Sequence, residues 1–93
     1  METKRAHVLI SGRVQGVFFR AWVKQRADGL GLVGWVRNTP EGQVEAVFEE
    51  NKEKIEKMIK LCHQGPLLAK VEKVEVKWDQ ATGEFKDFSM IYQ

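Results

Sequence analysis

The segment SGRVQGVFFR, residues 11–20, contains two glycines and ends in Arg20. Glycine-bearing backbone exposes N–H groups, and successive N–H groups can form a concave nest that binds an anion. The start of a helix adds unpaired donors and a partial positive charge. Arg20 adds a planar guanidinium that matches two oxygens of a phosphate or a carboxylate. This chemistry predicts an oxyanion site, with phosphate as the first candidate for its ligand.

A plain strand-to-helix turn explains the same residues, because glycine is common in such turns and Arg20 can be a solvated first-turn residue. From spacing alone this simpler interpretation is slightly favoured, since a short glycine pattern is a weak signal. The segment is not a Walker loop, because Val17 and Phe18 follow Gly16 where that loop has Lys-Ser or Lys-Thr. It is not a cysteine-phosphatase loop either, because no cysteine precedes Arg20.

The elements that must position this segment follow from hydrophobic periodicity. Alternation of apolar and polar residues predicts five strands, at 6–10, 34–38, 44–48, 74–78 and 88–92. Apolar residues at helical spacing predict one helix from Arg20 to glycines 29 and 31, and a second from an N-cap at Asn51 to Gly65-Pro66. The turn TPEG, residues 39–42, joins two of the strands as a hairpin, and a loop is expected at 79–83.

The resulting order, β-α-β-β-α-β with a short extra strand, is typical of the ferredoxin-like fold in the α+β class. We expect a single domain over residues 1–93, with two helices on one face of an antiparallel sheet. In this order the first two strands are parallel and the third lies between them. The C-terminal ends of those two strands therefore share one edge of the sheet, which places Asn38 beside the loop that contains Arg20.

Composition describes an ordinary globular chain of 93 residues, with 43% hydrophobic residues, 30% charged residues and a net charge of +2. Charges of both signs are interleaved, whereas a nucleic-acid binder usually shows a basic stripe. We therefore expect no nucleic-acid partner, and a small charged surface favours a monomer. No run approaches the ~18 apolar residues of a membrane span, and residues 1–13 lack the apolar stretch of a secretory signal. One cysteine excludes an internal disulfide, and we expect a cytoplasmic location.

The other reactive residue types have structural explanations. Cys62 lies on the apolar stripe of the second helix, which predicts a buried packing role. His7 and His63 are not spaced as metal ligands with each other or with Cys62, so neither a metal nor a cofactor is expected. Glu49, Glu50 and Glu53 are predicted to form a solvated stretch around a helix start.

Two segments together resemble the acylphosphatase family. IxGRVQGVFFR, residues 10–20, is similar to one signature of that family, and GWVRN, residues 34–38, with Gly42 and Val44, is similar to a second. Both lie in the right order, and the resemblance covers essentially the whole chain. Glu50 departs from the pattern, because the second signature usually ends in a glycine there. This departure concerns a local bend at the end of a strand and not the anion loop.

The resemblance implies an acylphosphate phosphohydrolase, whose partners are a small-molecule acyl phosphate and, as product or inhibitor, inorganic phosphate or sulfate. It implies that Arg20 binds the phosphate and that Asn38 positions the attacking water. It further implies that Gly12 allows the backbone to approach the asparagine and that Thr39 orients it. The backbone amides of the loop would line the phosphate site, at Gln15, Gly16, Val17, Phe18, Phe19 and Arg20.

Two other functions fit the same order of elements. One is a non-catalytic binding module for RNA or an anion. RNA-recognition domains place stacking aromatics on central strands, whereas Phe18 and Phe19 are adjacent at a loop-helix junction, and Glu45 and Glu49 oppose a basic sheet face. Instead, we expect one phenylalanine to pack under the loop and the other to border the acyl group. The other function is an acylphosphatase-like domain within a larger maturation or carbamoyl-transfer protein.

Overall fold

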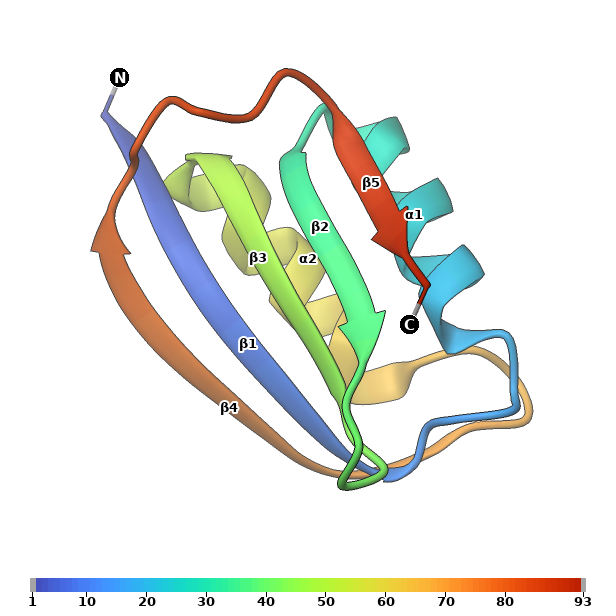
Figure 1. The fold of residues 1–93 in the computed structure, drawn as a ribbon. Coiled ribbons are helices and arrows are strands. Elements are labelled where there is room, and N and C mark those ends of the chain that lie inside the picture. The colour runs from blue at the N-terminus through green and yellow to red at the C-terminus, as the bar shows by residue number, and fades with distance from the viewer. Residues whose placement is uncertain (1, 93) are drawn as a thin grey trace.

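The computed structural model of the chain describes residues 2–92 and confirms the predicted ferredoxin-like α+β fold (Figure 1). Neither helix in this range is long and apolar enough to cross a membrane. The strand before the predicted 79–83 loop continues to Gln80, so that loop begins later than expected. The elements in chain order are β1 (Thr3–Arg13), α1 (Phe19–Leu30), β2 (Val33–Asn38), β3 (Val44–Asn51), α2 (Lys52–Gln64), β4 (Lys70–Gln80) and β5 (Phe88–Ile91).

The strands form one sheet in the order β4-β1-β3-β2-β5. Strand β3 lies between β1 and β2, as predicted, so the C-terminal ends of β1 and β2 reach the same edge of the sheet (Figure 1). The other neighbouring strands pair antiparallel, as predicted, and the short extra strand β5, whose direction was not predicted, pairs parallel to β2. The reason is the connection after β4, which crosses the far end of the sheet before β5 begins (Figure 1).

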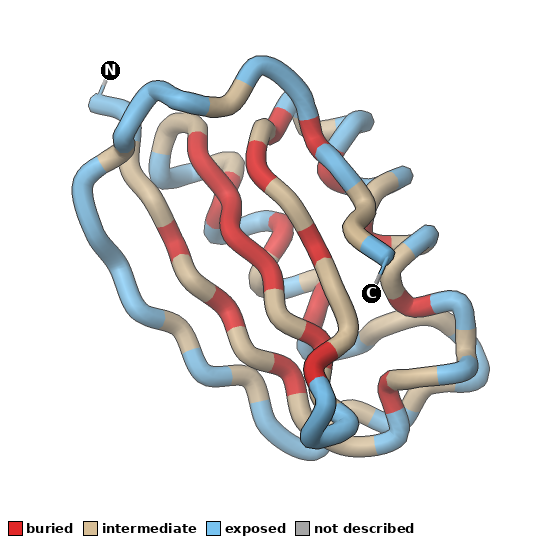
Figure 2. The backbone as a smooth tube through the Cα atoms, in the orientation of Figure 1, coloured by how far each residue is buried: buried red, intermediate tan, exposed pale blue. Residues whose placement is uncertain are grey.

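Both helices cover the same face of the sheet, and the core lies between the two layers (Figure 1). Figure 2 shows buried positions recurring along β1, β2 and β3, whereas the edge strand β4 is largely exposed. Cys62 of α2 is buried in this core, which confirms its predicted packing role. Burial raises the pKa of the Cys62 thiol to about 12. The core includes Val8 and Ile10 of β1, Ala46 and Phe48 of β3, and Val23, Ala27, Ile55, Met58 and Cys62 of the helices.

The two helices begin in different ways. The Asn51 side chain accepts a hydrogen bond from the Lys54 backbone N–H at 3.0 Å, which confirms it as the N-cap of α2. Helix α1 has no side-chain cap, and the residue before it, Phe18, has a left-handed backbone with φ of +61°. Gly31 caps the C-terminal end of α1, and its positive φ of +73° suits a glycine.

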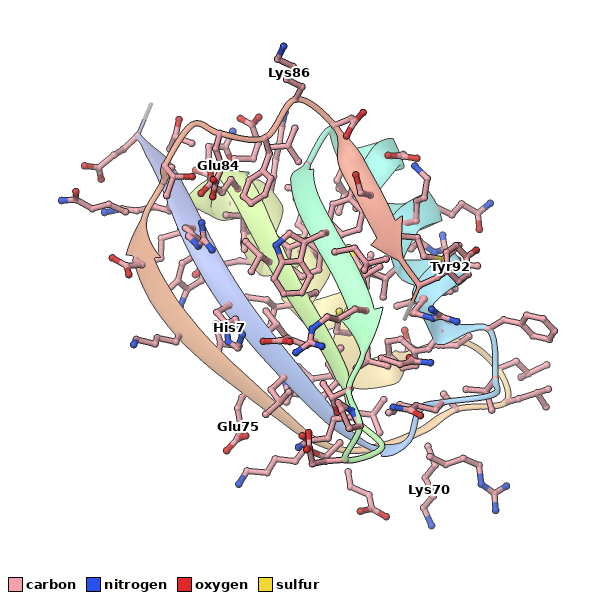
Figure 3. All side chains as sticks on the ribbon, viewed as in Figure 1. His7, Lys70, Glu75, Glu84, Lys86 and Tyr92 are labelled. Atoms are coloured by element: carbon pink, nitrogen blue, oxygen red, sulfur yellow. The ribbon has the colours of Figure 1, made fainter. Side chains whose placement is uncertain are left out.

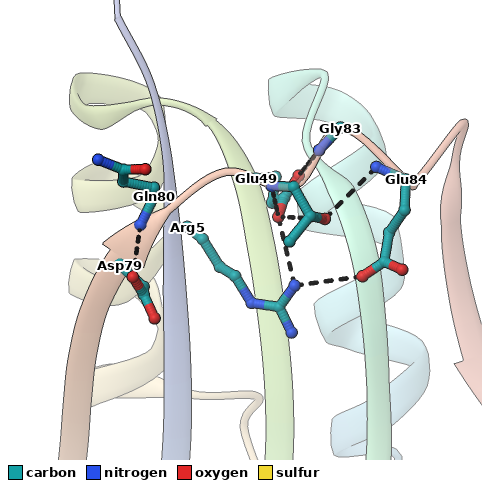
Figure 4. Close-up of polar contacts among 7 residues, drawn as sticks. Arg5, Glu49, Asp79, Gln80, Gly83 and Glu84 are labelled. Atoms are coloured by element: carbon teal, nitrogen blue, oxygen red, sulfur yellow. Dashed lines mark hydrogen bonds and ion pairs between the residues drawn. The ribbon is translucent and has the colours of Figure 1, made fainter.

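The prediction that Glu49 is solvated was wrong, because only 1% of this residue is exposed. Its carboxylate accepts hydrogen bonds from the Thr82 backbone N–H at 2.9 Å, the Thr82 hydroxyl at 3.1 Å and the Gly83 N–H at 3.2 Å. The Arg5 guanidinium lies 3.4 Å away (Figure 4). The crossing connection after β4 thus covers Glu49 and supplies hydrogen-bond donors to its carboxylate. Glu53 is exposed, as expected.

Candidate active site

The connection between β1 and α1, residues 14–18, is the segment predicted to bind an anion. Gly16 and Phe18 both have positive φ angles, of +72° and +61°. Within residues 2–92, no acceptor is found for the backbone N–H groups from Gln15 to Arg20. These donors precede or open helix α1, whose N-terminus carries a partial positive charge. The segment therefore has the backbone donors that an anion site requires.

Arg20 lies in the first turn of α1 and is held by the end of β5. Its Nη1 atom donates a hydrogen bond to the Ile91 carbonyl at 3.1 Å, and its Cζ atom lies 4.8 Å from the centre of the Tyr92 ring. Tyr92 follows β5 and lies beside the start of α1 (Figure 3). Arg20 is therefore not the solvated residue of a plain turn. Within residues 2–92, one of its five N–H donors binds the protein.

Asn38 ends β2 and is brought to the same place by strand register. Arg37 pairs with Ile91 in the parallel β2–β5 ladder, so Asn38 and Tyr92 are the next positions along the two strands. Side chains alternate along a strand, and Val36, two residues before Asn38, is buried under the helices. Asn38 and Tyr92 therefore both belong to the face that the helices cover, at the edge where α1 begins.

A cavity of about 340 Å³ lies where these elements meet. Arg20 contributes the charged side chain of its lining, Asn38 contributes an amide, and most of the other lining residues are apolar. The cavity thus combines a cationic group with apolar walls. Its lining includes five of the predicted site residues, which are Gly16, Phe18, Phe19, Arg20 and Asn38.

Gln15 and Val17, also predicted to bind phosphate through their amides, do not line this cavity. Instead, the Gln15 side chain joins the loop to the β2–β3 turn, because its Nε2 atom donates to the Thr39 and Gln43 carbonyls at 2.8 Å each. Both carbonyls follow Asn38 in the chain. Gln15 therefore fixes the anion loop against the turn that follows Asn38. Sequence reasoning missed this role, because a loop glutamine gives no sign of which distant carbonyls it will reach.

Thr39 and Gly12 have different neighbours from those expected. The Thr39 hydroxyl accepts a hydrogen bond from the Gln43 N–H at 3.1 Å, which closes the turn and does not involve Asn38. Gly12, at φ of +125°, lies against β4, since a Cβ atom there would be 2.2 Å from the Lys70 carbonyl oxygen. The close approach predicted at Gly12 thus exists, but its partner is β4 and not Asn38. Both residues support the frame of the site.

Comparison with known proteins identifies the family. A model of the family described as acylphosphatase matches residues 6–90. The chain belongs to the acylphosphatase family. An acylphosphatase of Roseiflexus sp. (strain RS-1) is 51% identical over 92 residues, which is 99% of each of the two chains.

Solved structures of acylphosphatases share this fold. The acylphosphatase from Bacillus subtilis superimposes with a TM-score of 0.92 at 30% identity, over 96% of this chain and 99% of that one. Full-length HypF, solved in a phosphate- and nucleotide-bound form, gives a TM-score of 0.86 at 26% identity, over 98% of this chain and 12% of HypF. Relatives of this acylphosphatase-family chain therefore include both single-domain enzymes and part of a larger protein.

Apart from Arg20, the charged side chains of residues 2–92 do not line the cavity. Glu45 of β3 accepts from Arg37 Nε at 2.6 Å and lies 2.5 Å from His7 Nε2. Burial alone raises the pKa of the Glu45 carboxyl, but the hydrogen bonds and charges of His7 and Arg37 outweigh it and lower the pKa. Within residues 2–92, no three His, Cys, Asp or Glu side chains gather as a metal site would require. Glu50, the departure from the family pattern, lies at the far end of β3, where it is opposite Lys4 in the register of the β1–β3 ladder.

Proposed function

We propose that this acylphosphatase-family chain hydrolyses the carboxyl-phosphate anhydride of small acyl phosphates to a carboxylate and inorganic phosphate. The observation that carries the proposal is the meeting of Arg20 and Asn38 in one cavity, beside backbone donors of the β1–α1 loop that have no acceptor among residues 2–92. A guanidinium and backbone N–H groups bind a phosphate dianion, and an amide binds a water. These are the two reactants of the hydrolysis.

In the proposed mechanism, Arg20 and the loop amides hold the phosphate and stabilise the charge that it carries in the transition state. The Asn38 amide oxygen accepts a hydrogen bond from a water and holds that water in line with the phosphorus, which makes the attack effectively unimolecular. The water oxygen bonds to phosphorus while the bond to the acyl oxygen breaks, and the proton that the water loses passes to an oxygen of the substrate's own phosphate. The carboxylate is a weak base and leaves without a strong general acid.

Further parts of the proposal concern the molecule as a whole. We propose that residues 1–93 act as a single-domain cytoplasmic monomer, without a metal or a cofactor, and that phosphate or sulfate binds as product or inhibitor. The free Cys62 thiol suits a reducing compartment. The RNA-binding alternative is not favoured, because Phe18 is exposed while Phe19 is buried in the core, so the two rings do not form one stacking platform.

The direct test is hydrolysis of benzoyl phosphate by the wild-type chain and by Asn38→Ala, with and without EDTA. If Asn38 positions the water, Asn38→Ala loses most of kcat while inhibition by inorganic phosphate persists. Gln25→Ala, which removes an exposed amide of α1 outside the cavity, serves as the control. Near-normal kcat in Asn38→Ala removes this residue from the mechanism. Loss of activity in EDTA that a divalent cation restores contradicts the metal-free proposal.

A further inference from the structure

Fold stability does not explain why a phenylalanine stands at position 18. Its φ of +61° places it in the left-handed region, which is a true outlier for a bulky residue and which a glycine adopts without strain. Its side chain contributes little packing in return, because 80% of the residue is exposed. Strain of this kind is found at functional sites, where the surrounding structure maintains it. The phenyl ring is therefore a candidate for contact with a ligand.

The cavity supplies the place for that contact. Phe18 lines the same cavity as Arg20 and Asn38. The adjacent Phe19 is only 2% exposed and belongs to the core, so it is closed to a ligand over most of its surface. Of the two adjacent phenylalanines, Phe18 is the one that can cover an apolar group lying above the phosphate.

In-line attack decides which part of the substrate lies near Phe18. The water and the leaving group stand on opposite sides of the phosphorus. The proposed water site is at Asn38, beside β5, where the Tyr92 ring already stacks on Arg20. Figure 1 shows the start of α1, which contains Arg20, between the end of β2 and the outer bend of the β1–α1 connection. The leaving carboxylate therefore points away from Asn38 and toward the connection that contains Phe18.

We propose that Phe18 is the residue that selects the acyl group, and that the preferred substrates are acyl phosphates with an apolar aryl or branched aliphatic group. The inference rests on the proposed function of the site. Arg20 and the loop amides bind the phosphate that all acyl phosphates share, so they do not distinguish one acyl group from another. Apolar area that the acyl group buries against the phenyl ring supplies the distinction.

The test compares kcat/KM for benzoyl phosphate with kcat/KM for acetyl phosphate within each protein. This ratio cancels any effect on the phosphate loop, because both substrates present the same phosphate. Phe18→Asn removes the ring but keeps a residue that tolerates the left-handed backbone. Phe18→Leu keeps an apolar side chain. Leu67→Asn is the matched control, because Leu67 is 97% exposed and does not line the cavity.

We expect the benzoyl-to-acetyl ratio to fall about tenfold in Phe18→Asn, as for the loss of one apolar contact in a specificity pocket. Phe18→Leu should fall between Phe18→Asn and the wild-type chain, and Leu67→Asn should keep the wild-type ratio. An unchanged ratio in both Phe18 variants overturns the inference, and so does an equal fall in Leu67→Asn. A wild-type chain that hydrolyses neither substrate overturns the proposed function itself, which is a different result from an active enzyme with an unaltered ratio.

Discussion

The Arg20 side chain makes two contacts with the end of β5 and the residue after it. One nitrogen of its guanidinium donates to the Ile91 carbonyl, and its plane lies over the Tyr92 ring. These two contacts restrict the Arg20 side chain before any ligand binds. A lysine has one nitrogen on a flexible stem and cannot satisfy a carbonyl, stack on a ring and bind two phosphate oxygens together.

We therefore predict that Arg20→Lys is nearly as harmful as Arg20→Ala. Either change should cost about 2–4 kcal/mol in transition-state binding, the range for a lost charge-assisted contact. The measurement is kcat/KM for benzoyl phosphate. Arg26→Lys is the control, because Arg26 is also an arginine of α1, stacks on Trp22 and lies outside the cavity. An Arg20→Lys enzyme that retains most of its kcat/KM would show that a point charge is sufficient.

Residue types alone suggested an anion loop at residues 11–20 but slightly favoured a plain turn, so the roles proposed for Arg20 and Asn38 rest on the resemblance between two whole segments. The structure brings Arg20 and Asn38 to one cavity. The contacts of Gly12 and Thr39 differ from those that the sequence led us to expect. Gly12 meets Lys70 of β4, and Thr39 bonds to Gln43 across a turn. One sequence shows that a glycine is needed, but it does not show which strand will approach it.

Three elements must keep their relative positions for this site to exist, namely the β1–α1 loop, the β2–β3 turn and β5. Gln15 joins the first two through its paired 2.8 Å hydrogen bonds. Helix α1 holds the third, because Arg20 donates to the Ile91 carbonyl and Lys24 donates to the Phe88 carbonyl at 3.0 Å. The residues proposed to bind phosphate and the residue proposed to bind the water are thus on separate elements, connected by side-chain-to-backbone hydrogen bonds.

Removal of the two Gln15 hydrogen bonds should therefore affect the chemical step more than phosphate binding. We predict that Gln15→Leu lowers kcat by about tenfold to a hundredfold, because a displacement near 1 Å has effects of this size. Inhibition by inorganic phosphate should change much less. The measurements are kcat and the phosphate inhibition constant, with Gln25→Leu on exposed α1 surface as the control. If Gln15→Leu lowers only the melting temperature and leaves kcat intact, the Gln15 hydrogen bonds stabilise the fold and have no role in catalysis.

At the scale of elements, periodicity predicted both helices and all five strands, but not how the last strand pairs. The alternation of Phe88, Met90 and Tyr92 indicates a strand and carries no information about its direction. That direction depends on the crossing connection, and the connection depends on Glu49, which was predicted to be solvated. The error has a physical reason, since the donors that make burial of this carboxylate possible come from Thr82 and Gly83.

Across the whole molecule, the proposed chemistry and the main buried charge lie at opposite ends of the sheet. Asn38 pairs with Val44 at one end of the β2–β3 ladder, and Glu49 pairs with Val33 at the other. We predict that Glu49→Gln destabilises the fold by about 2–4 kcal/mol, because an amide N–H₂ would face the N–H donors of Thr82 or Gly83 and leave some of them unpaired. Urea unfolding measures this loss. The value of kcat should stay unchanged, and a matching fall in kcat would show that the two ends are coupled.

Phosphate binding should connect the site to the stability of the whole chain. A ligand that binds only the folded state stabilises it, by about 2.7 kcal/mol at a hundred times its dissociation constant. We predict that phosphate raises the melting temperature of the wild-type chain, with chloride matched for ionic strength, and that Arg20→Lys loses most of this shift. Glu49→Gln should start from a lower melting temperature and still gain about the same free energy from phosphate, because distant sites contribute additively. If phosphate stabilises Arg20→Lys as strongly as the wild-type chain, then the anion binds somewhere other than the β1–α1 loop, and the proposed site loses its ligand.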